Sequence, residues 1–406
     1  MKLQYQDCIC DSLKCIILEK LKNKVQPKCI YLDLPYHSNV GDSLIWLGTE
    51  EFLKEIGSTC IGKHSKDTFD FKEIPQDCTI ILHGGGNFGD IWREHQEFRN
   101  KVCQTYPQNN IIVLPQTIYY ESNELLADDI GIFNNHRKLS ICARDQYSYD
   151  LLVHNGYVGD ILLVPDMAFC INRKSLMVMA KRCNKELLLL TRNDKEFPSL
   201  DTKITTADFR DWSGMQENGD IAWEYTHTHA PEEVDEFFQN SFLRELIKEG
   251  VEFVSEYKEV YSTRLHVVIL RLLLGLDVYL LDNSYGKNSH FVDTWLKDSS
   301  QIKHIDTQQE KEILIAMHYN QRIKTISLDR DNLRRTNDFV KQQVSETMEQ
   351  LSLVKRSNDG LTKEVAELAD RIKYITRKNQ KLGNILKYSV IAYTIVLIIL
   401  LIFILK

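Results

Sequence analysis

Residues 79–92, TIILHGGGNFGDIW, decide the fold of this chain. Residues of strand-forming type lead directly into three consecutive glycines, and a helix-like segment follows near 91–105. A buried strand, a polar turn and a helix form the repeating unit of a parallel α/β sheet. Three glycines in succession let a ligand approach the backbone closely, and the start of the next helix favours an anion.

The same alternation continues on both sides of this unit. Further apolar runs predict strands at 29–34, 111–115, 139–143 and 161–164. Between these runs, helix-like segments lie near 42–56, 121–135 and 145–155. Strands that are apolar almost throughout predict a parallel sheet with helices on both faces.

A second alternation follows a stretch that we interpret as a linker, residues 171–185. Strands are predicted at 187–190, 251–254 and 278–281. Helices are predicted at 231–248, 263–274 and 288–297. We therefore expect an α/β fold of two Rossmann-like domains, residues 1–172 and 173–322, with ligands bound outside the carboxyl ends of the strands.

Composition narrows the possible functions. The chain has 406 residues, of which 43% are apolar, and this length suits two domains with additional segments. Its net charge of −7 argues against a general nucleic-acid-binding protein. The ten cysteines form no C-x-x-C pair, so we expect reduced thiols and no metal site. The N-terminus does not have the pattern of a signal peptide.

The C-terminal part predicts a membrane-anchored stalk. Residues 323–387 carry a seven-residue apolar repeat in which Asn337, Asn358 and Asn379 take equivalent positions, typical of a parallel two-stranded coiled coil. Residues 388–405 lack any charge and are long enough for one transmembrane helix. Lysines and arginines before this span predict a body on the cytoplasmic face of the membrane, held as a parallel homodimer. The alternatives are a single helix that packs on the body and, for the last residues, a buried core helix.

Polar residues or glycines follow each predicted strand of the first domain, where an α/β fold places its chemistry. In chain order they are Asn39 and Asp42, then Gly84, Gly85, Gly86, Asn87 and Asp90, then Gln116, Arg144 and Asp166. Arg144 could bind a carboxylate or phosphate through two hydrogen bonds, or could instead pair with a nearby acid. The glycine-rich turn fits neither a dinucleotide fingerprint nor a Walker A loop.

The second domain contributes cations and a histidine. Arg264 and His266 precede a strongly apolar helix, and a cation with an imidazole at a helix start suits anion binding and proton transfer. Lys287 lies in the turn LLDNSYGKN, residues 280–288. Each residue also has an ordinary structural interpretation: a core histidine, a paired arginine or a solvated lysine.

In combination these segments resemble the polysaccharide pyruvyl transferase family, in particular its exopolysaccharide-biosynthesis members. The resemblance runs in order from about residue 30 to 300 and includes HGGGNFGDIW with Gln96 and Arg99, VLPQTIYY, CARDQYSY, LLVPDMAF, STRLH and LDNSYGKNS. It implies a GT-B-like fold, phosphoenolpyruvate as donor and a galactose-type or N-acetylhexosamine unit of a surface glycan as acceptor. The predicted stalk and anchor lie outside it.

The resemblance also implies roles for the site residues. Arg144 and Arg264 are expected to hold the carboxylate and phosphate of the donor, and His266 to act as general acid or to assist the leaving phosphate. Lys287 is expected to add a phosphate contact, and Gly84 to Asn87 to admit a substrate to the backbone. Asp42, Asp90 and Asp166 are open alternatives for the acceptor or the general base. No cofactor is expected.

The product would be a pyruvate ketal on a surface polysaccharide or on its lipid-linked precursor. Two other functions remain open at this stage. One is a GT-B glycosyltransferase that uses a sugar nucleotide, since enzymes of this class have the same kind of two-domain fold. The other is a non-catalytic, membrane-tethered dimeric scaffold, although the intact ARD, TRLH and YGKN segments argue against a decayed site.

Overall fold

The computed structural model describes residues 9–190, 208–210, 216–282 and 286–303, with short pieces between 341 and 374. The chain divides into two compact units, 1–318 and 319–406. Apart from those short pieces, the predicted coiled coil lies outside the described residues, and the predicted span at 388–405 lies wholly outside them. None of the helices in the described ranges is both long and apolar enough to cross a bilayer.

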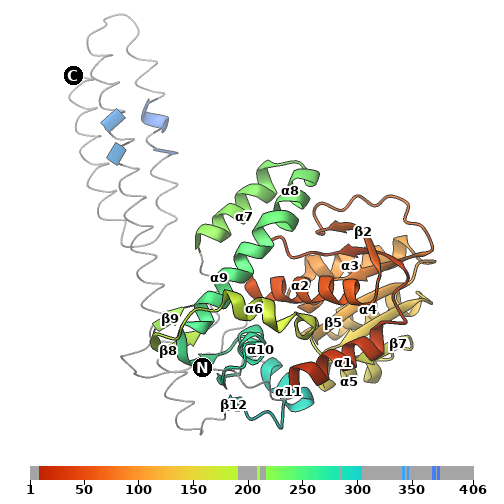
Figure 1. Ribbon diagram of the computed structural model, residues 1–406. Coiled ribbons are helices and arrows are strands. Elements are labelled where there is room, and N and C mark those ends of the chain that lie inside the picture. The colour runs from red at the N-terminus through yellow and green to blue at the C-terminus, as the bar shows by residue number, and fades with distance from the viewer. Residues whose placement is uncertain are drawn as a thin grey trace, which may run out of the picture. The chain divides into compact units, whose positions relative to one another are not determined.

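The first sheet of unit 1–318 is parallel throughout (Figure 1). Its order is β2-β1-β3-β5-β6-β7, with the short β4 paired to β5. The strands are β1 (Lys28–Leu32), β2 (Thr59–His64), β3 (Cys78–Leu82), β4 (Gly85–Gly89), β5 (Ile111–Tyr119), β6 (Leu139–Ala143) and β7 (Asp160–Leu163).

The second sheet is also parallel, in the order β12-β11-β10-β8-β9. Its strands are β8 (Lys185–Leu190), β9 (Asp208–Arg210), β10 (Tyr257–Ser262), β11 (Val278–Leu280) and β12 (Ile302–Lys303). In both sheets the first strand in the chain lies between the second and the third. Strand order therefore reverses between β1 and β3 and between β8 and β10, the positions at which doubly wound sheets bind ligands.

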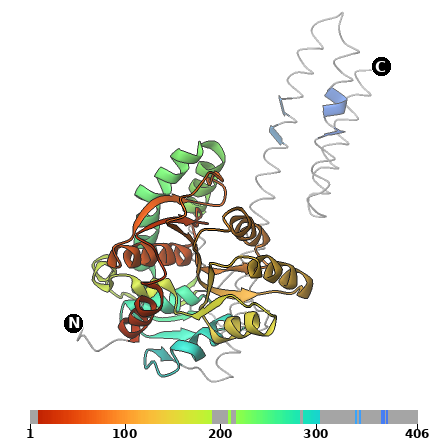
Figure 2. The ribbon, with the colours of Figure 1, turned by 90° about the vertical axis from the view of Figure 1, so that its right-hand side faces the viewer.

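Helices cover both faces of the first sheet (Figures 1 and 2). In the first half they are α1 (Ile9–Leu21), α2 (Val40–Glu55), α3 (Arg93–Thr105), α4 (Asn123–Asn134), α5 (Gln146–His154) and the short 3₁₀ helix η1 (Met167–Cys170). In the second half they are α6 (Arg173–Met179), α7 (Gln216–Thr228), α8 (Pro231–Phe237), the π-helical turn η3 (Phe238–Phe242), α9 (Leu243–Ser255), α10 (Leu265–Leu273) and α11 (Lys287–Trp295).

Alternate residues of the first sheet belong to two apolar cores. Ile80 and Leu82 of β3 pack in one core with α3 and α4, whereas Ile81 packs in the other with α1 and α2. This division follows from the two-residue period of a strand. The second core continues without a break through Leu188 and Val254, so the two sheets share one apolar interior.

The predicted α/β class with parallel sheets is confirmed, and the five strands expected in the first sheet are present as β1, β3, β5, β6 and β7. The strand predicted at 251–254 is wrong, because these residues belong to α9 and continue the apolar face of that helix. The buried residues of α9 recur every three to four positions, at Leu243, Leu246, Ile247, Gly250, Val251 and Val254. The strand of this region is β10 instead, and the predicted linker contains α6.

Candidate active site

Four neighbouring strands of the first sheet bring to their carboxyl ends buried polar atoms that lack a hydrogen bond. Among the described residues, Asp33 Oδ2, His83 Nε2, Gln116 Oε1 and Arg144 Nη2 are buried without a hydrogen bond. They belong to or directly follow β1, β3, β5 and β6, which lie side by side in that order. Buried polar atoms are nearly always hydrogen-bonded, so such a cluster marks a place where a ligand completes the network. The strand reversal between β1 and β3 lies within it.

Arg144 is fixed by two neighbours and leaves one guanidinium nitrogen without a partner. Its Nε donates to Thr117 Oγ1 at 2.8 Å, and its Nη1 donates to Asp166 Oδ2 at 2.8 Å. Because Arg144 and Asp166 are fully buried, the charge of each side chain is stabilised by the opposite charge of the other. The buried Nη2 is therefore held in one orientation with its protons available to an anion.

Asp166 also joins the two halves of the chain. Its Oδ2 lies 3.1 Å from Nε2 of His266, the second residue of α10. Burial alone raises the pKa of Asp166, but the charges of His266 and Arg144 and the hydrogen bond from His266 outweigh it, so the pKa lies well below its usual range. An ionised aspartate thus orients the His266 ring from one side, as in a carboxylate–histidine pair of an acid–base enzyme.

Glycines make room for the cationic and histidine side chains. A Cβ at Gly86 would lie 2.2 Å from Lys287 Nζ and 3.4 Å from Arg144 Nη2, so both cations converge on this backbone position. A Cβ at Gly41 would lie 2.5 Å from Nδ1 of His266. The first turn of α2, the glycine-rich turn and α10 therefore meet around the Arg144–Asp166–His266 cluster.

Asp42 provides a second carboxylate beside this cluster. Asn39 caps α2 through Gly41 N and donates from Nδ2 to Asp42 Oδ2 at 2.8 Å, and His37 Nε2 lies 3.7 Å from the same oxygen. Burial works against ionisation of Asp42, but nearby histidines and Lys287 lower its pKa on balance. The Asp42 Oδ1 atom lies 3.4 Å from where a Cβ of Gly85 would be.

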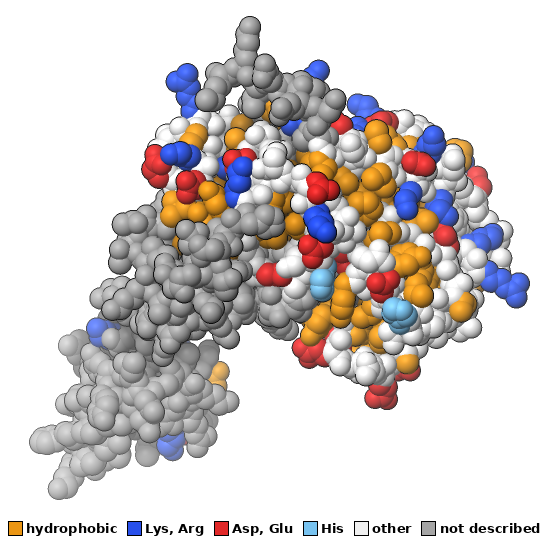
Figure 3. Space-filling model, turned by 90° about the horizontal axis from the view of Figure 1, so that it is seen from below, with side chains coloured by type: hydrophobic (Ala, Val, Ile, Leu, Met, Phe, Trp, Pro, Cys, Tyr) orange, Lys and Arg blue, Asp and Glu red, His pale blue; other side chains and the backbone are white. Residues whose placement is uncertain are grey.

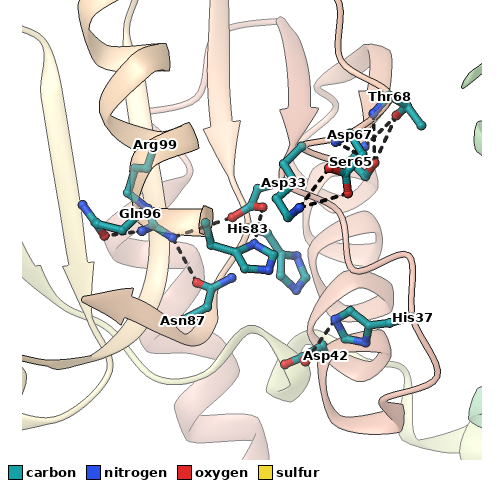
Figure 4. Close-up of polar contacts among 12 residues, drawn as sticks. Asp33, His37, Asp42, Ser65, Asp67, Thr68, His83, Asn87, Gln96 and Arg99 are labelled. Atoms are coloured by element: carbon teal, nitrogen blue, oxygen red, sulfur yellow. Dashed lines mark hydrogen bonds and ion pairs between the residues drawn. The ribbon is translucent and has the colours of Figure 1, made fainter. Parts of the chain in front are cut away.

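A buried network fixes the other side of the glycine-rich turn (Figure 4). Asn87 Oδ1 accepts from Arg99 Nη2 at 3.0 Å and from Gln116 Nε2 at 2.9 Å. Asp33 Oδ1 lies 2.7 Å from His95 Nδ1, and its other carboxylate oxygen lies 3.7 Å from Arg99 Nη2. Asp33 has a φ of 63°, a left-handed conformation that is uncommon outside glycine and is found at functional sites.

The predicted residues do not all share one role. His266, Arg144 and Asp166 form one hydrogen-bonded cluster, with Lys287, Gly85, Gly86 and Asp42 around it. Asp90 accepts through Oδ2 from the amides of Glu121 and Ser122, while its buried Oδ1 has no hydrogen bond among the described residues. A Cβ at Gly84 would meet Pro115 O at 2.9 Å, so Gly84 allows a close approach of two backbone segments. Arg264 is buried and is the N-cap residue of α10, two residues before His266 in the sequence.

Sequence reasoning missed Asp33, His37 and His83. His83 directly precedes the three glycines, and this position was the only signal in the sequence. Asp33 is the last but one residue of the first predicted strand, and nothing in the sequence indicates its positive φ.

The cations of the site are internal. Arg144 is 0% exposed, Arg264 6% and Lys287 7%, whereas basic and acidic side chains are interspersed on the face seen in Figure 3. Buried positive charge thus lies at the strand ends, close to the candidate site. Within the described ranges, no group of three or more His, Cys, Asp or Glu side chains could hold a metal ion.

The parallel α/β body thus has buried cations and a carboxylate–histidine pair at its strand ends, groups with which enzymes bind anions and transfer protons. The model of the family described as polysaccharide pyruvyl transferase matches residues 39–285. The chain belongs to this polysaccharide pyruvyl transferase family, as its motifs predicted, and transfer of pyruvyl groups to polysaccharide is the activity that defines the family.

Two curated relatives agree with this assignment, and one solved structure has a similar fold. EpsO of Bacillus subtilis, a candidate pyruvyl transferase, is 31% identical over 300 residues, 72% of this chain and 92% of EpsO. Pyruvyl transferase 1 of Schizosaccharomyces pombe is 26% identical over 66% of this chain and 70% of its own. The crystal structure of an uncharacterised Klebsiella pneumoniae protein has the same fold, with a TM-score of 0.51, 24% identity and coverage of 73% of this chain and 98% of that protein.

Proposed function

We propose that this enzyme uses phosphoenolpyruvate as donor and forms a pyruvate ketal on a sugar of a surface glycan, with release of phosphate. The observation that carries the proposal is the convergence of Arg144 Nη2 and Lys287 Nζ on Gly86, beside His266. Phosphoenolpyruvate has a carboxylate and a phosphate close together, and two buried cations match two anionic groups of this kind.

In the proposed reaction His266 gives a proton to C3 of the donor, which leaves positive character at C2. A sugar hydroxyl attacks C2, a second hydroxyl closes the ring, and the C2–O bond to phosphate breaks. Of the two hydroxyl protons, one replaces the proton lost from His266 and the other leaves on phosphate. Asp166 orients His266, and Arg144, Arg264 and Lys287 stabilise the donor and the departing phosphate.

The acceptor in this proposal is a lipid-linked precursor at the cytoplasmic face of the membrane, and the C-terminal apolar stretch anchors a parallel homodimer there. Support comes from the sequence alone, from the uncharged run at 388–405 and the heptad repeat before it. Attachment to the same surface as the acceptor raises the effective concentration of the two partners.

The test is incubation of the full chain in detergent with phosphoenolpyruvate and a p-nitrophenyl galactoside or N-acetylhexosaminide. Phosphate release that depends on the acceptor, with a product mass increased by one pyruvate ketal, is the expected result. Transfer of a hexose from a sugar nucleotide, with phosphoenolpyruvate inert, would overturn the proposal. A second test is the Arg264→Ala variant, which should lose activity while it remains folded.

A further inference from the structure

His83 is a buried histidine that has no role in the reaction as proposed above. It follows β3 directly and is 2% exposed. Its ring stacks on that of Tyr31 with centroids 5.7 Å apart, and its main-chain carbonyl accepts from Gln116 Nε2 at 2.7 Å. The charges of Asp42, Asp33, His37 and Asp166 all act on the imidazole, so it lies inside the candidate site (Figure 4).

If every contact along Thr49, Tyr31 and His83 is a hydrogen bond, the donors can follow one another in one order only. Thr49 Oγ1 lies 2.8 Å from Ile45 O, and because a carbonyl only accepts, the Thr49 hydroxyl must donate there. Tyr31 donates its hydroxyl proton to Thr49 Oγ1 at 3.3 Å. The remaining contact, 2.5 Å between Tyr31 OH and His83 Nδ1, then needs a proton from Nδ1.

In this order of donors Nδ1 of His83 carries the proton, so Nε2 has a lone pair that can accept one. That atom is buried and has no hydrogen-bond partner among the described residues. Burial also lowers the pKa of His83 to about 4, since it outweighs the raising effect of Asp42 and Asp33, so the ring is neutral at neutral pH. A neutral imidazole with an unoccupied lone pair accepts a proton, whereas His266 is oriented by an ionised aspartate and suits proton donation.

We infer that His83 Nε2 is the general base that removes the proton from the attacking sugar hydroxyl, while Tyr31 holds the ring in the required tautomer. In this step the hydroxyl O–H bond breaks, its proton moves to Nε2, and the oxygen forms the bond to C2 of the donor. The proton on Nε2 then passes to His266 and replaces the proton that His266 gave to C3. The inference rests on the proposed function, because it assigns a second role within the same reaction.

The tautomer can be tested without any turnover. Histidine-specific ¹⁵N labelling of the full chain in detergent, with the His83→Gln variant for assignment, distinguishes a protonated from an unprotonated Nε2 at pH 7. An unprotonated Nε2 on a neutral ring is the expected result. A proton on Nε2 with an unprotonated Nδ1 would overturn the inference, whatever the donor of the enzyme proves to be.

Kinetics test the catalytic role. His83→Gln should lower kcat for ketal formation by about 10²-fold or more, the usual effect of a general base, and retain the thermal stabilisation that phosphoenolpyruvate gives the wild type. A kcat within threefold of wild type, or loss of stabilisation by phosphoenolpyruvate, would refute the assignment. A wild type that is inactive with phosphoenolpyruvate would instead refute the proposed function, and the NMR result would still stand.

Two matched controls separate catalysis from packing. His136 is a buried histidine whose Nε2 contacts Tyr106 O at 3.0 Å, outside the site, and His136→Gln should keep wild-type kcat. Tyr31→Phe removes the partner of Nδ1 and should lower kcat about tenfold. Tyr106→Phe removes a buried hydroxyl that donates to Lys72 O at 2.7 Å and should not change kcat. Equal losses in Tyr31→Phe and Tyr106→Phe would contradict the role of Tyr31.

Discussion

Replacement of Gly86 by alanine tests whether the site depends on the approach of Lys287 and Arg144 to the backbone. An added Cβ would lie 2.2 Å from Lys287 Nζ. Carbon and nitrogen atoms pack no closer than about 3.5 Å without repulsion, so the ammonium must move by about 1.3 Å. The moving atom is the end of a flexible side chain, and Gly86 has no positive φ, so the fold can absorb the change.

The expected effect is therefore on activity and not on folding. Displacement of one charged hydrogen-bond donor from an anionic donor substrate costs about 1.5–3 kcal/mol, which corresponds to about 10- to 150-fold in kcat/KM for phosphoenolpyruvate. The free energy of unfolding should change by no more than about 1 kcal/mol. Both are measurable, by initial rates of phosphate release and by denaturant unfolding.

The matched control is Gly131→Ala in α4, where a Cβ would have no atom within 4 Å. This variant should be as active as wild type and slightly more stable, because alanine is the better helix former by about 1 kcal/mol. Full activity of Gly86→Ala in a folded protein would show that Lys287 and Arg144 do not act on the donor at this position. Unfolding of Gly86→Ala would show that the turn is rigid and would refute the flexible-lysine argument.

Three further changes have defined outcomes. Asp166→Asn should lower kcat by about 10²-fold or more and also destabilise the fold by about 3–5 kcal/mol, because Arg144 keeps its charge in a buried place; phosphate release and urea unfolding measure the two effects. Arg271→Met should destabilise by a similar amount without changing kcat of the folded enzyme, since its guanidinium donates to the carbonyls of Val254, Tyr257, Lys258 and Asp277, none of which belongs to the site. The pKa of His83 in the folded protein is about 4, below the ordinary value of 6.5. The contribution of His83 to the free energy of unfolding is therefore complete above pH 6.5 and falls by up to about 3 kcal/mol as the pH is lowered toward 4. The His83→Gln variant should show a flatter dependence of stability on pH over this range.

The sequence predicted those strands that are buried on both faces. Residues 111–115 and 139–143 are apolar at every position or nearly so, and both lie within strands, β5 and β6. β2 and β10 mix polar with apolar residues, and β4 reads GGNFG, so local composition did not indicate them. Residues 251–254 were misassigned because a run of four residues does not distinguish a strand from one turn of an apolar helix face.

The residues of the candidate site that could be predicted are those that stand just after a strand or at the start of a helix. Arg144, Asp166 and His266 were identified because each stands just after a strand or at a helix start. Asp33 and His83 occupy similar positions, but their importance depends on a positive φ and on a hydrogen-bond chain through Tyr31 and Thr49. Such properties depend on contacts between residues far apart in the chain, and one sequence does not contain them.

The shared apolar core has a consequence for catalysis. His266 belongs to the second half of the chain, while Asp166, Arg144 and His83 belong to the first. The proposed proton transfers by His266 and His83 therefore require the two halves to keep one alignment. Two close contacts of the first turn of α2, one with α9 and one with His266 of α10, hold this alignment. A Cβ at Gly250 of α9 would lie 2.4 Å from Val40, and a Cβ at Gly41 would lie 2.5 Å from His266. Since α2, α9 and α10 pack in the same core, the packing that stabilises the fold also fixes the distance between the proposed acid and the proposed base.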